Sequence, residues 1–186
     1  MPRASQMIGW FVIGAVVLGG SFFGSLRLID WYFPGLGYDV ASLPRLEIGR
    51  TVTFGNGENR GALIQGWSNP ESWGVWSDGN LAELGFVVLG SAGEDARLVI
   101  EYKAFINDRM PRQEVQFWSR NTELNDVTLA KASGTITVQL AGLRLGPGYP
   151  LILQLRIPLA TSPRQLALSQ DARKLGLGLV SVRFEK

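Results

Sequence analysis

Glu71 and Asp78 are the residues whose type and spacing could do chemistry, because they lie seven positions apart in the segment GWSNPESWGVWSDG, residues 66–79. Glycosidases use two carboxyl groups at a set separation across the scissile bond. The chain contains no His and no Cys, so only carboxylates, Ser or Lys could supply acid–base or nucleophilic groups. Neither a G-x-S-x-G nor an S-x-x-K motif occurs. We therefore expect a protein that is not an enzyme, with an anchored glycosidase as an alternative.

Three tryptophans, Trp67, Trp73 and Trp76, lie in the same segment, and two interpretations of them stay open. In the first, the indoles tuck into the edge of the domain, Glu71 accepts backbone or indole N–H bonds, and Asp78 closes the turn into the next strand. In the second, at least one indole is exposed and stacks on a sugar ring. Trp73 lies mid-loop and is the one expected to be exposed. These five residues form the predicted carbohydrate- or partner-binding site.

A second polar cluster is expected near the C-terminus, in the segment TSPRQLALSQDARKLGLGL, residues 161–179. Alternation brings Asp171 and Arg173 within reach of each other. Charged pairs in loops are more often scaffolding than chemistry, so the two residues predict a hydrogen-bonded structural corner before the last strand.

Composition removes several function classes. Formal net charge is only +2 and the basic residues are scattered among acidic ones, so no nucleic-acid-binding stripe is predicted. No calcium-loop spacing occurs, and the absence of His and Cys removes the usual zinc ligands. We predict no metal and no cofactor. An apolar content of 46% indicates a globular domain.

The body of the chain reads as short strands without a convincing helix. Expected strands occupy residues 45–54, 62–65, 82–89, 97–105, 113–119, 126–130, 134–141, 151–156 and 178–184. Short alternating runs separated by Gly and polar turns are typical of sandwiches and barrels. We therefore predict an all-β, jelly-roll-like antiparallel β-sandwich, with a barrel as the alternative, preceded by one N-terminal transmembrane helix.

The membrane helix is predicted because 23 uncharged residues separate Arg3 from Arg27. This length spans the roughly 30 Å hydrocarbon core of a bilayer. The predicted organisation is a cytoplasmic tail at 1–6, the helix at 7–29, an interfacial segment and linker at 30–44, and an extracytoplasmic β-sandwich at 45–186. A signal peptide cleaved near Ser25 is the alternative. The chain is thus expected to be a single-pass protein of the bacterial inner membrane, with its N-terminus in the cytoplasm and its domain in the periplasm.

Gly20 and Gly24 form a G-x-x-x-G pair within this helix. Small residues at this spacing let two membrane helices approach closely. We predict that this face packs on a membrane-embedded partner, with plain lipid exposure as the alternative.

Two motifs together carry a resemblance to a known family. The tryptophan-rich segment precedes a strand that starts Ala82-x-Leu84, and later an SP pair and S-x-D-x-R-x-LG precede the last strand. From about residue 50 to 186 the chain resembles a β-sandwich domain of bacterial membrane glycosyltransferases, exopolysaccharide-synthesis proteins and glycerophosphotransferases.

The resemblance implies a role beside an enzyme, because no catalytic part accompanies the domain here. It implies a non-catalytic accessory subunit of an inner-membrane polysaccharide synthase or glycosyltransferase complex, which stabilises the catalytic subunit or guides the glycan. The implied partners are that glycosyltransferase, the lipid bilayer and the nascent polysaccharide. A free-standing, membrane-tethered carbohydrate-binding module is the alternative.

Overall fold

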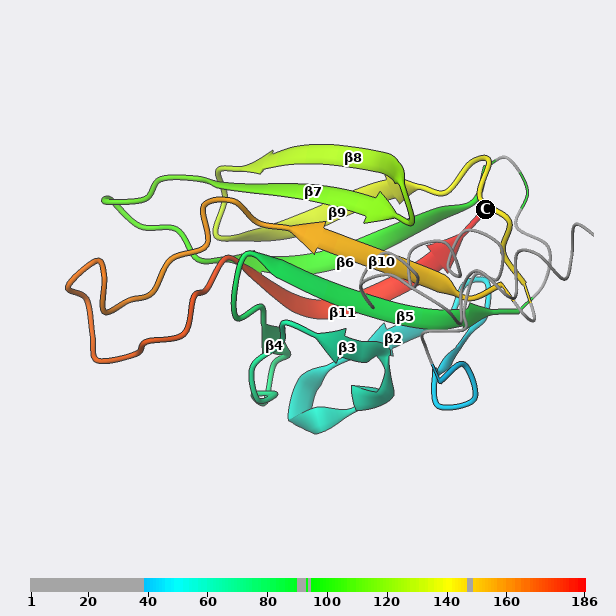
Figure 1. Cartoon of the computed structure of the whole chain (residues 1–186), viewed down its shortest axis with the longest axis horizontal. Coiled ribbons are helices and arrows are strands. Elements are labelled where there is room, and N and C mark those ends of the chain that lie inside the picture. The colour runs from blue at the N-terminus through cyan, green and yellow to red at the C-terminus, as the bar shows by residue number, and fades with distance from the viewer. Residues whose placement is uncertain (1–38, 90–92, 94, 147–148) are drawn as a thin grey trace, which may run out of the picture. The chain divides into compact units, whose positions relative to one another are not determined.

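The computed structural model describes residues 39–89, 93, 95–146 and 149–186, and in them the chain forms two β-sheets around one core (Figure 1). The strands are β1 Arg45–Leu46, β2 Thr51–Thr53, β3 Leu63–Gln65, β4 Val75–Trp76, β5 Leu81–Val88, β6 Arg97–Ala104, β7 Gln113–Ser119, β8 Thr122–Leu129, β9 Ser133–Gln139, β10 Leu151–Arg156 and β11 Leu177–Glu185. Two 3-10 helices, η1 Gly55–Gly57 and η2 Arg60–Ala62, lie between β2 and β3. The predicted all-β class is confirmed, and the two sheets correspond to a sandwich.

The first sheet has the strand order β1-β5-β10-β7-β8, with β3 also paired to β5. β10 pairs antiparallel with β5, from Leu151 opposite Phe86 to Arg156 opposite Leu81. β1 pairs parallel with β5, so this sheet is mixed. Figure 1 shows β5, β10, β7 and β8 following one another across the sheet. We call the surface of this sheet that points away from the core the outer face.

The second sheet has the order β2-β11-β6-β9, with β4 also paired to β11. β11 and β6 pair antiparallel along their length, with a register shift between Leu179 and Ser181. β4 pairs with the first part of β11, whereas β2 pairs with its later part. The last strand therefore receives the tryptophan-rich segment, which contains β4, directly beside it.

The core lies between the two sheets and follows the strand period of two. In β6, four residues at alternating positions are all buried: Leu98, Ile100, Tyr102 and Ala104. In β5 the core-facing residues are fully buried: Ala82, Leu84, Phe86 and Val88. All eight belong to one hydrophobic cluster, which joins the sheets into a single domain.

The prediction of a single strand at residues 45–54 is wrong in the number of strands. The chain there forms two strands: β1 joins β5 in the first sheet and β2 joins β11 in the second. The segment between them contains Gly49, whose φ of 80° lies in the left-handed region that glycine adopts without strain. Alternation along the segment could not reveal this change of sheet, because both halves present apolar residues at the same period.

The other predicted strands differ from the structure mainly at their ends. β7 and β10 have the predicted bounds, whereas β8 begins at Thr122, four residues before the expected start. β8 is the edge strand of its sheet and most of its residues are exposed or half-buried. An edge strand tolerates polar residues on both faces, so its first half carries no apolar alternation. β4 is too short to be recognised from the sequence.

The predicted membrane helix at 7–29, with Gly20 and Gly24, lies outside the described residues, as does most of the predicted linker. In the part of the chain that the structure describes, no helix has the length and apolar character needed to cross a membrane. The last residues of the linker do contact the domain. Leu43 is 8% exposed, and its side chain lies over Gly85 of β5 together with that of Ile64.

Candidate functional site at the tryptophan corner

Residues 66–79 and 171–178, far apart in the sequence, lie side by side and form what we call the tryptophan corner, together with residues 103–105. The backbone of Gly79 donates to the carbonyl of Lys174 at 2.9 Å, and the Lys174 N–H donates to Asp78 Oδ1 at 2.9 Å. Ser77 exchanges hydrogen bonds with Leu177: its N–H donates to the Leu177 carbonyl at 2.8 Å, and its hydroxyl accepts from the Leu177 N–H at 3.1 Å. Both sequence motifs therefore belong to one structural unit at the start of β11.

Arg173 is the cation at the centre of this unit. Its guanidinium pairs with Asp171 through Nη2 and Nε, at 2.7 and 3.0 Å from Oδ2. Nη1 lies 3.5 Å from Glu71 Oε1 and donates to the Ser68 hydroxyl at 3.2 Å. The predicted contact of Asp171 with Arg173 is confirmed, and Arg173 also binds the tryptophan-rich segment.

The charges of this pair reinforce each other. The hydrogen bonds from Arg173, its side chain first and its backbone second, hold the pKa of Asp171 below its usual value. The hydrogen bond to Asp171 likewise raises the pKa of Arg173, so both groups are charged at neutral pH. The pair is partly exposed, with 36% of the Arg173 side chain and 27% of the Asp171 side chain accessible. We call the Glu71–Arg173–Asp171 cluster, with Ser68, the latch.

Trp67 is held by contacts within the fold. Its indole N–H donates to the carbonyl of Glu83 at 2.8 Å, and its ring packs against the hydrophobic cluster. A backbone bridge to Ser77 closes the segment on itself. Trp67 thus joins the tryptophan corner to β5 of the first sheet.

Trp73 and Trp76 pack edge to face at the end of the second sheet. Their ring centroids are 5.2 Å apart with planes at 73°, and Trp76 meets Phe105 in the same manner at 6.4 Å. Gly178 of β11 lies directly beneath, where a Cβ would stand 2.7 Å from Trp73 Cη2 and 3.0 Å from Trp76 Cε3. A residue without a side chain is required at Gly178 for the rings to pack this closely.

The Trp73 ring is not an open platform. Its N–H donates to Glu71 Oε2 at 2.9 Å, and the ammonium of Lys103 lies 3.9 Å from its centroid. Trp67, Trp73 and Trp76 are all half-buried, so exposure does not single out Trp73. Stacking of a sugar on Trp73 stays a prediction, and it would require the ring face that Lys103 leaves free.

Glu71 and Asp78, the two carboxylates considered for acid–base chemistry, both have internal partners. Glu71 accepts from the Trp73 indole and pairs with Arg173, whereas Asp78 accepts from the Lys174 backbone N–H. Groups engaged in this way fix the corner geometrically. Chemically, the corner can present a rigid surface. This surface combines half-buried indoles with one ammonium and one guanidinium.

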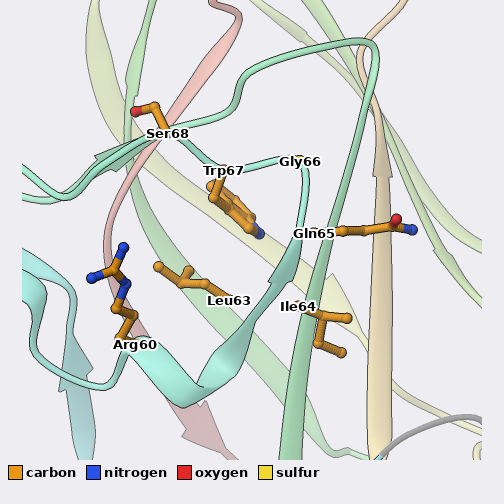
Figure 2. Close-up of a pocket in the computed structure, with 7 residues that line it drawn as sticks. All are labelled: Arg60, Leu63, Ile64, Gln65, Gly66, Trp67 and Ser68. Carbon is orange, nitrogen blue, oxygen red and sulfur yellow. The ribbon is translucent and has the colours of Figure 1, made fainter.

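A small pocket of about 150 Å³ lies at the side of this corner. Figure 2 shows Arg60, Leu63, Trp67 and Ser68 around it, contributed by η2, β3 and the start of the tryptophan-rich segment. Its lining combines one guanidinium with an indole and a leucine. The hydroxyl of Ser68, at its rim, also accepts from Arg173, so the pocket adjoins the latch.

Sequence reasoning missed three residues of the corner: Ser68, Lys103 and Phe105. Lys103 and Phe105 come from β6 and the residue after it, and only strand pairing between β6 and β11 brings them to the tryptophans. No spacing in the sequence encodes that pairing. Ser68 lies within the motif itself, but a lone serine in a polar loop gives no signal.

The chain matches one protein family, described as Domain of unknown function (DUF7024), over residues 55–186. No curated protein matches it.

Three solved structures are similar to the chain at low identity. The first is a family two carbohydrate esterase from Clostridium thermocellum in complex with cellohexaose, at 14% identity and a TM-score of 0.39, covering 73% of this chain and 31% of that one. The second is the C-terminal CBM6 of a marine laminarinase from Zobellia galactanivorans, at 10% identity and a TM-score of 0.43, covering 74% and 98%. The third is an uncharacterised protein from Listeria monocytogenes, at 14% identity and a TM-score of 0.37, covering 67% and 10%. The chain thus spans about a third of the esterase chain.

Proposed function

The chain belongs to the DUF7024 family, and we propose that it is a non-catalytic accessory subunit of a polysaccharide synthase or glycosyltransferase complex in the bacterial inner membrane. Its N-terminal apolar segment would cross the bilayer and pack on the catalytic subunit through Gly20 and Gly24. Its domain, which we assign to the jelly-roll type, would stand in the periplasm where the glycan emerges. There it would stabilise the catalytic subunit or guide the polymer.

The observation that carries this proposal is the internal engagement of Glu71 and Asp78. A glycosidase would need both carboxyl groups turned toward a substrate cleft. Here Glu71 is held by Trp73 and Arg173, and Asp78 by the backbone of Lys174. This supports a binding or scaffolding role over hydrolysis.

The surface of the tryptophan corner is a second observation that supports the proposed function. Glu71 of the latch accepts the indole N–H of Trp73, and Trp73 packs edge to face on Trp76, while both residues stay half-buried. Rigid aromatic side chains with a nearby cation resemble the residues that dominate binding at protein interfaces and ligand sites. The partly exposed indoles also favour the second candidate, a tethered carbohydrate-binding module that acts without a synthase.

Co-purification tests the proposal. The full-length chain, tagged at its C-terminus, is extracted in mild detergent and its companions are identified by mass spectrometry. A membrane-embedded glycosyltransferase should accompany the wild-type chain. Replacing Gly20 and Gly24 with Leu should remove it, because bulk at the closest approach prevents helix packing.

A control variant on another face of the predicted helix tests whether the effect is specific to the glycine face. Leu at Ser21 and Ser25 repeats the same spacing but points about 100° away around the helix, so co-purification should survive. If the glycine variant retains the enzyme while Trp73→Ala loses it, the contact lies at the tryptophan corner. A wild-type chain that comes alone but retains sugar affinity would refute the accessory role in favour of the second candidate.

A further inference from the structure

The outer face of the first sheet carries a row of polar side chains that no part of the tryptophan corner uses. In the cross-strand register Gln65 lies beside Glu83, Glu83 beside Gln154, and Gln154 beside Trp118. The row therefore crosses β3, β5, β10 and β7. Figure 2 shows Gln65 pointing away from Trp67, across β5 and toward β10. Two amides, one carboxylate and one indole are thus presented from adjacent strands.

Glu83 is the unusual member of this row. Its neighbours Ala82 and Leu84 face the core, so alternation directs Glu83 outward, yet it is only 4% exposed. It accepts a hydrogen bond of 2.7 Å from Gln154 Nε2. Removing a carboxylate from water costs free energy unless hydrogen bonds compensate for it. An outward carboxylate that is nevertheless buried and amide-bonded indicates an organised polar array and not an ordinary solvated surface.

Trp118 supplies the second observation. Its indole Nε1 is buried and has no hydrogen-bond partner among the described residues. A buried N–H without an acceptor is costly and rare in folded proteins. The guanidinium of Arg156, an exposed residue, covers the ring with Cζ 4.3 Å from its centroid. A long exposed side chain can swing away at little cost, which would open the indole to a ligand that offers an acceptor.

The charges around Trp118 indicate which ligand fits. Glu123 pairs with Trp118 across β7 and β8, and Asp126 pairs with Gln116 in the next row. With Glu83, this makes three carboxylates around the single guanidinium of Arg156 in these two rows. Such a surface repels an anionic ligand and tolerates a neutral one.

We propose that the outer face, centred on Trp118, binds a neutral oligosaccharide. The apolar face of a sugar ring packs on the indole once Arg156 has moved aside. Sugar hydroxyls both donate and accept, so they can pair with Glu83, with the amides of Gln65 and Gln154, and with the free indole N–H. The site deepens the proposed accessory role by naming the class of glycan, and it rests on that role only for the source of the polymer.

Calorimetric titration of the detergent-solubilised full chain tests the site. The probes are hexaoses of glucose, mannose, galactose and N-acetylglucosamine, with hexagalacturonate as the anionic counterpart. At least one neutral hexaose should bind, and hexagalacturonate should bind at least about tenfold more weakly. Trp118→Phe keeps the ring but loses the N–H, and should weaken binding by about tenfold.

Two further variants separate loss of the site from loss of the fold and from removal of an exposed amide elsewhere. Gln65→Ala changes an exposed residue, so it should leave the melting temperature unchanged while weakening hexaose binding by about threefold or more. Gln139→Ala is the matched control, because it removes an exposed amide from β9 of the second sheet, and its hexaose affinity should equal that of the wild type.

Three results would overturn the site: no neutral hexaose binds, hexagalacturonate binds as tightly as the neutral sugars, or Trp118→Phe and Gln65→Ala bind like the wild type. Co-purification read in parallel distinguishes this from a failure of the accessory role. Trp118→Phe should retain the membrane enzyme, because the predicted contact lies elsewhere. Loss of the enzyme from the wild type, with Trp118-dependent sugar binding intact, would refute the accessory role alone.

Discussion

Trp73, in the turn before β4, and Trp118, in β7 of the first sheet, have similar companions, yet their indole N–H groups differ. Each ring is covered by a cation, Lys103 at 3.9 Å and Arg156 at 4.3 Å. The N–H of Trp73 donates to Glu71, whereas that of Trp118 is buried without a partner among the described residues. The first tryptophan is therefore complete within the fold, and the second lacks one interaction.

A cluster of tryptophans in the sequence therefore does not by itself locate a ligand site. At the tryptophan corner the polar groups around the rings bond to one another, so the cluster stabilises the start of β11. At Trp118 a single indole stands among polar side chains with one donor unused. Unsatisfied hydrogen-bonding capacity distinguishes the two regions better than aromatic density does.

Gly178→Ala should have the largest effect on the corner. The added Cβ would stand 2.7 Å from Trp73 and 3.0 Å from Trp76, so the rings must shift. Overpacking of this kind costs about 1–3 kcal/mol, which urea unfolding measures. Gly93→Ala is the control, because no atom of the described residues lies within 4 Å of its Cβ position, and its change should stay within about 0.5 kcal/mol. Equal effects of the two would show that the ring packing is not tight.

Arg173→Met should rank second. It removes the paired hydrogen bonds to Asp171 and the contacts to Glu71 and Ser68, while keeping most of the apolar stem. Because the side chain is about a third exposed, we expect a loss of about 1–2 kcal/mol in the free energy of unfolding.

Arg183→Met provides the matched control for the latch. Arg183 pairs with Glu185 at the surface, and its side chain is 49% exposed. Its loss should cost less than about 0.5 kcal/mol. If Arg183→Met is as harmful as Arg173→Met, the latch contributes no more than an ordinary surface ion pair.

The latch should also be sensitive to pH, with a smaller effect. The pKa of Asp171 is lowered in the folded state by hydrogen bonds from Arg173, so its stabilisation is present above the unfolded pKa of about 3.9. It is lost as the pH falls through the folded pKa. The difference in unfolding free energy between wild type and Arg173→Met should therefore shrink as the pH is lowered from 6 toward 2. Glu185, whose pKa is also lowered, is present in both proteins and cancels in the comparison. A difference that stays constant with pH would exclude a charged Asp171 as the partner.

Smaller effects than those of Gly178→Ala and Arg173→Met are expected from removing the two cations that cover the rings. Lys103→Gln should lower the free energy of unfolding by about 0.5–1 kcal/mol, because a cation–π contact contributes that much at a partly exposed site. Arg156→Gln should cost a similar amount, but it should also increase quenching of tryptophan fluorescence by acrylamide, since Trp118 becomes uncovered. Unchanged quenching in Arg156→Gln would mean that another group covers that ring.

Much of the fold could be predicted from the sequence, because strand alternation is local. The bounds of β7 and β10 follow from it, as does the shared face of Leu98 and Ile100. The proximity of Asp171 and Arg173 is equally local, since the two residues are separated by one position in the chain. These features depend on backbone geometry that neighbouring residues impose on each other.

The sites depend on pairing between distant segments, which only the tertiary structure decided. Arg173 reaches Glu71, and Lys103 reaches Trp73, because β11 takes β4 and β6 as its neighbours. Glu83 in the apolar run AELGFVVL is visible in the sequence as an oddity, but its place in a row that ends at Trp118 is not. Alternation determines which face of a strand a residue occupies, whereas the register between strands determines its partners, and register follows from packing of the whole core.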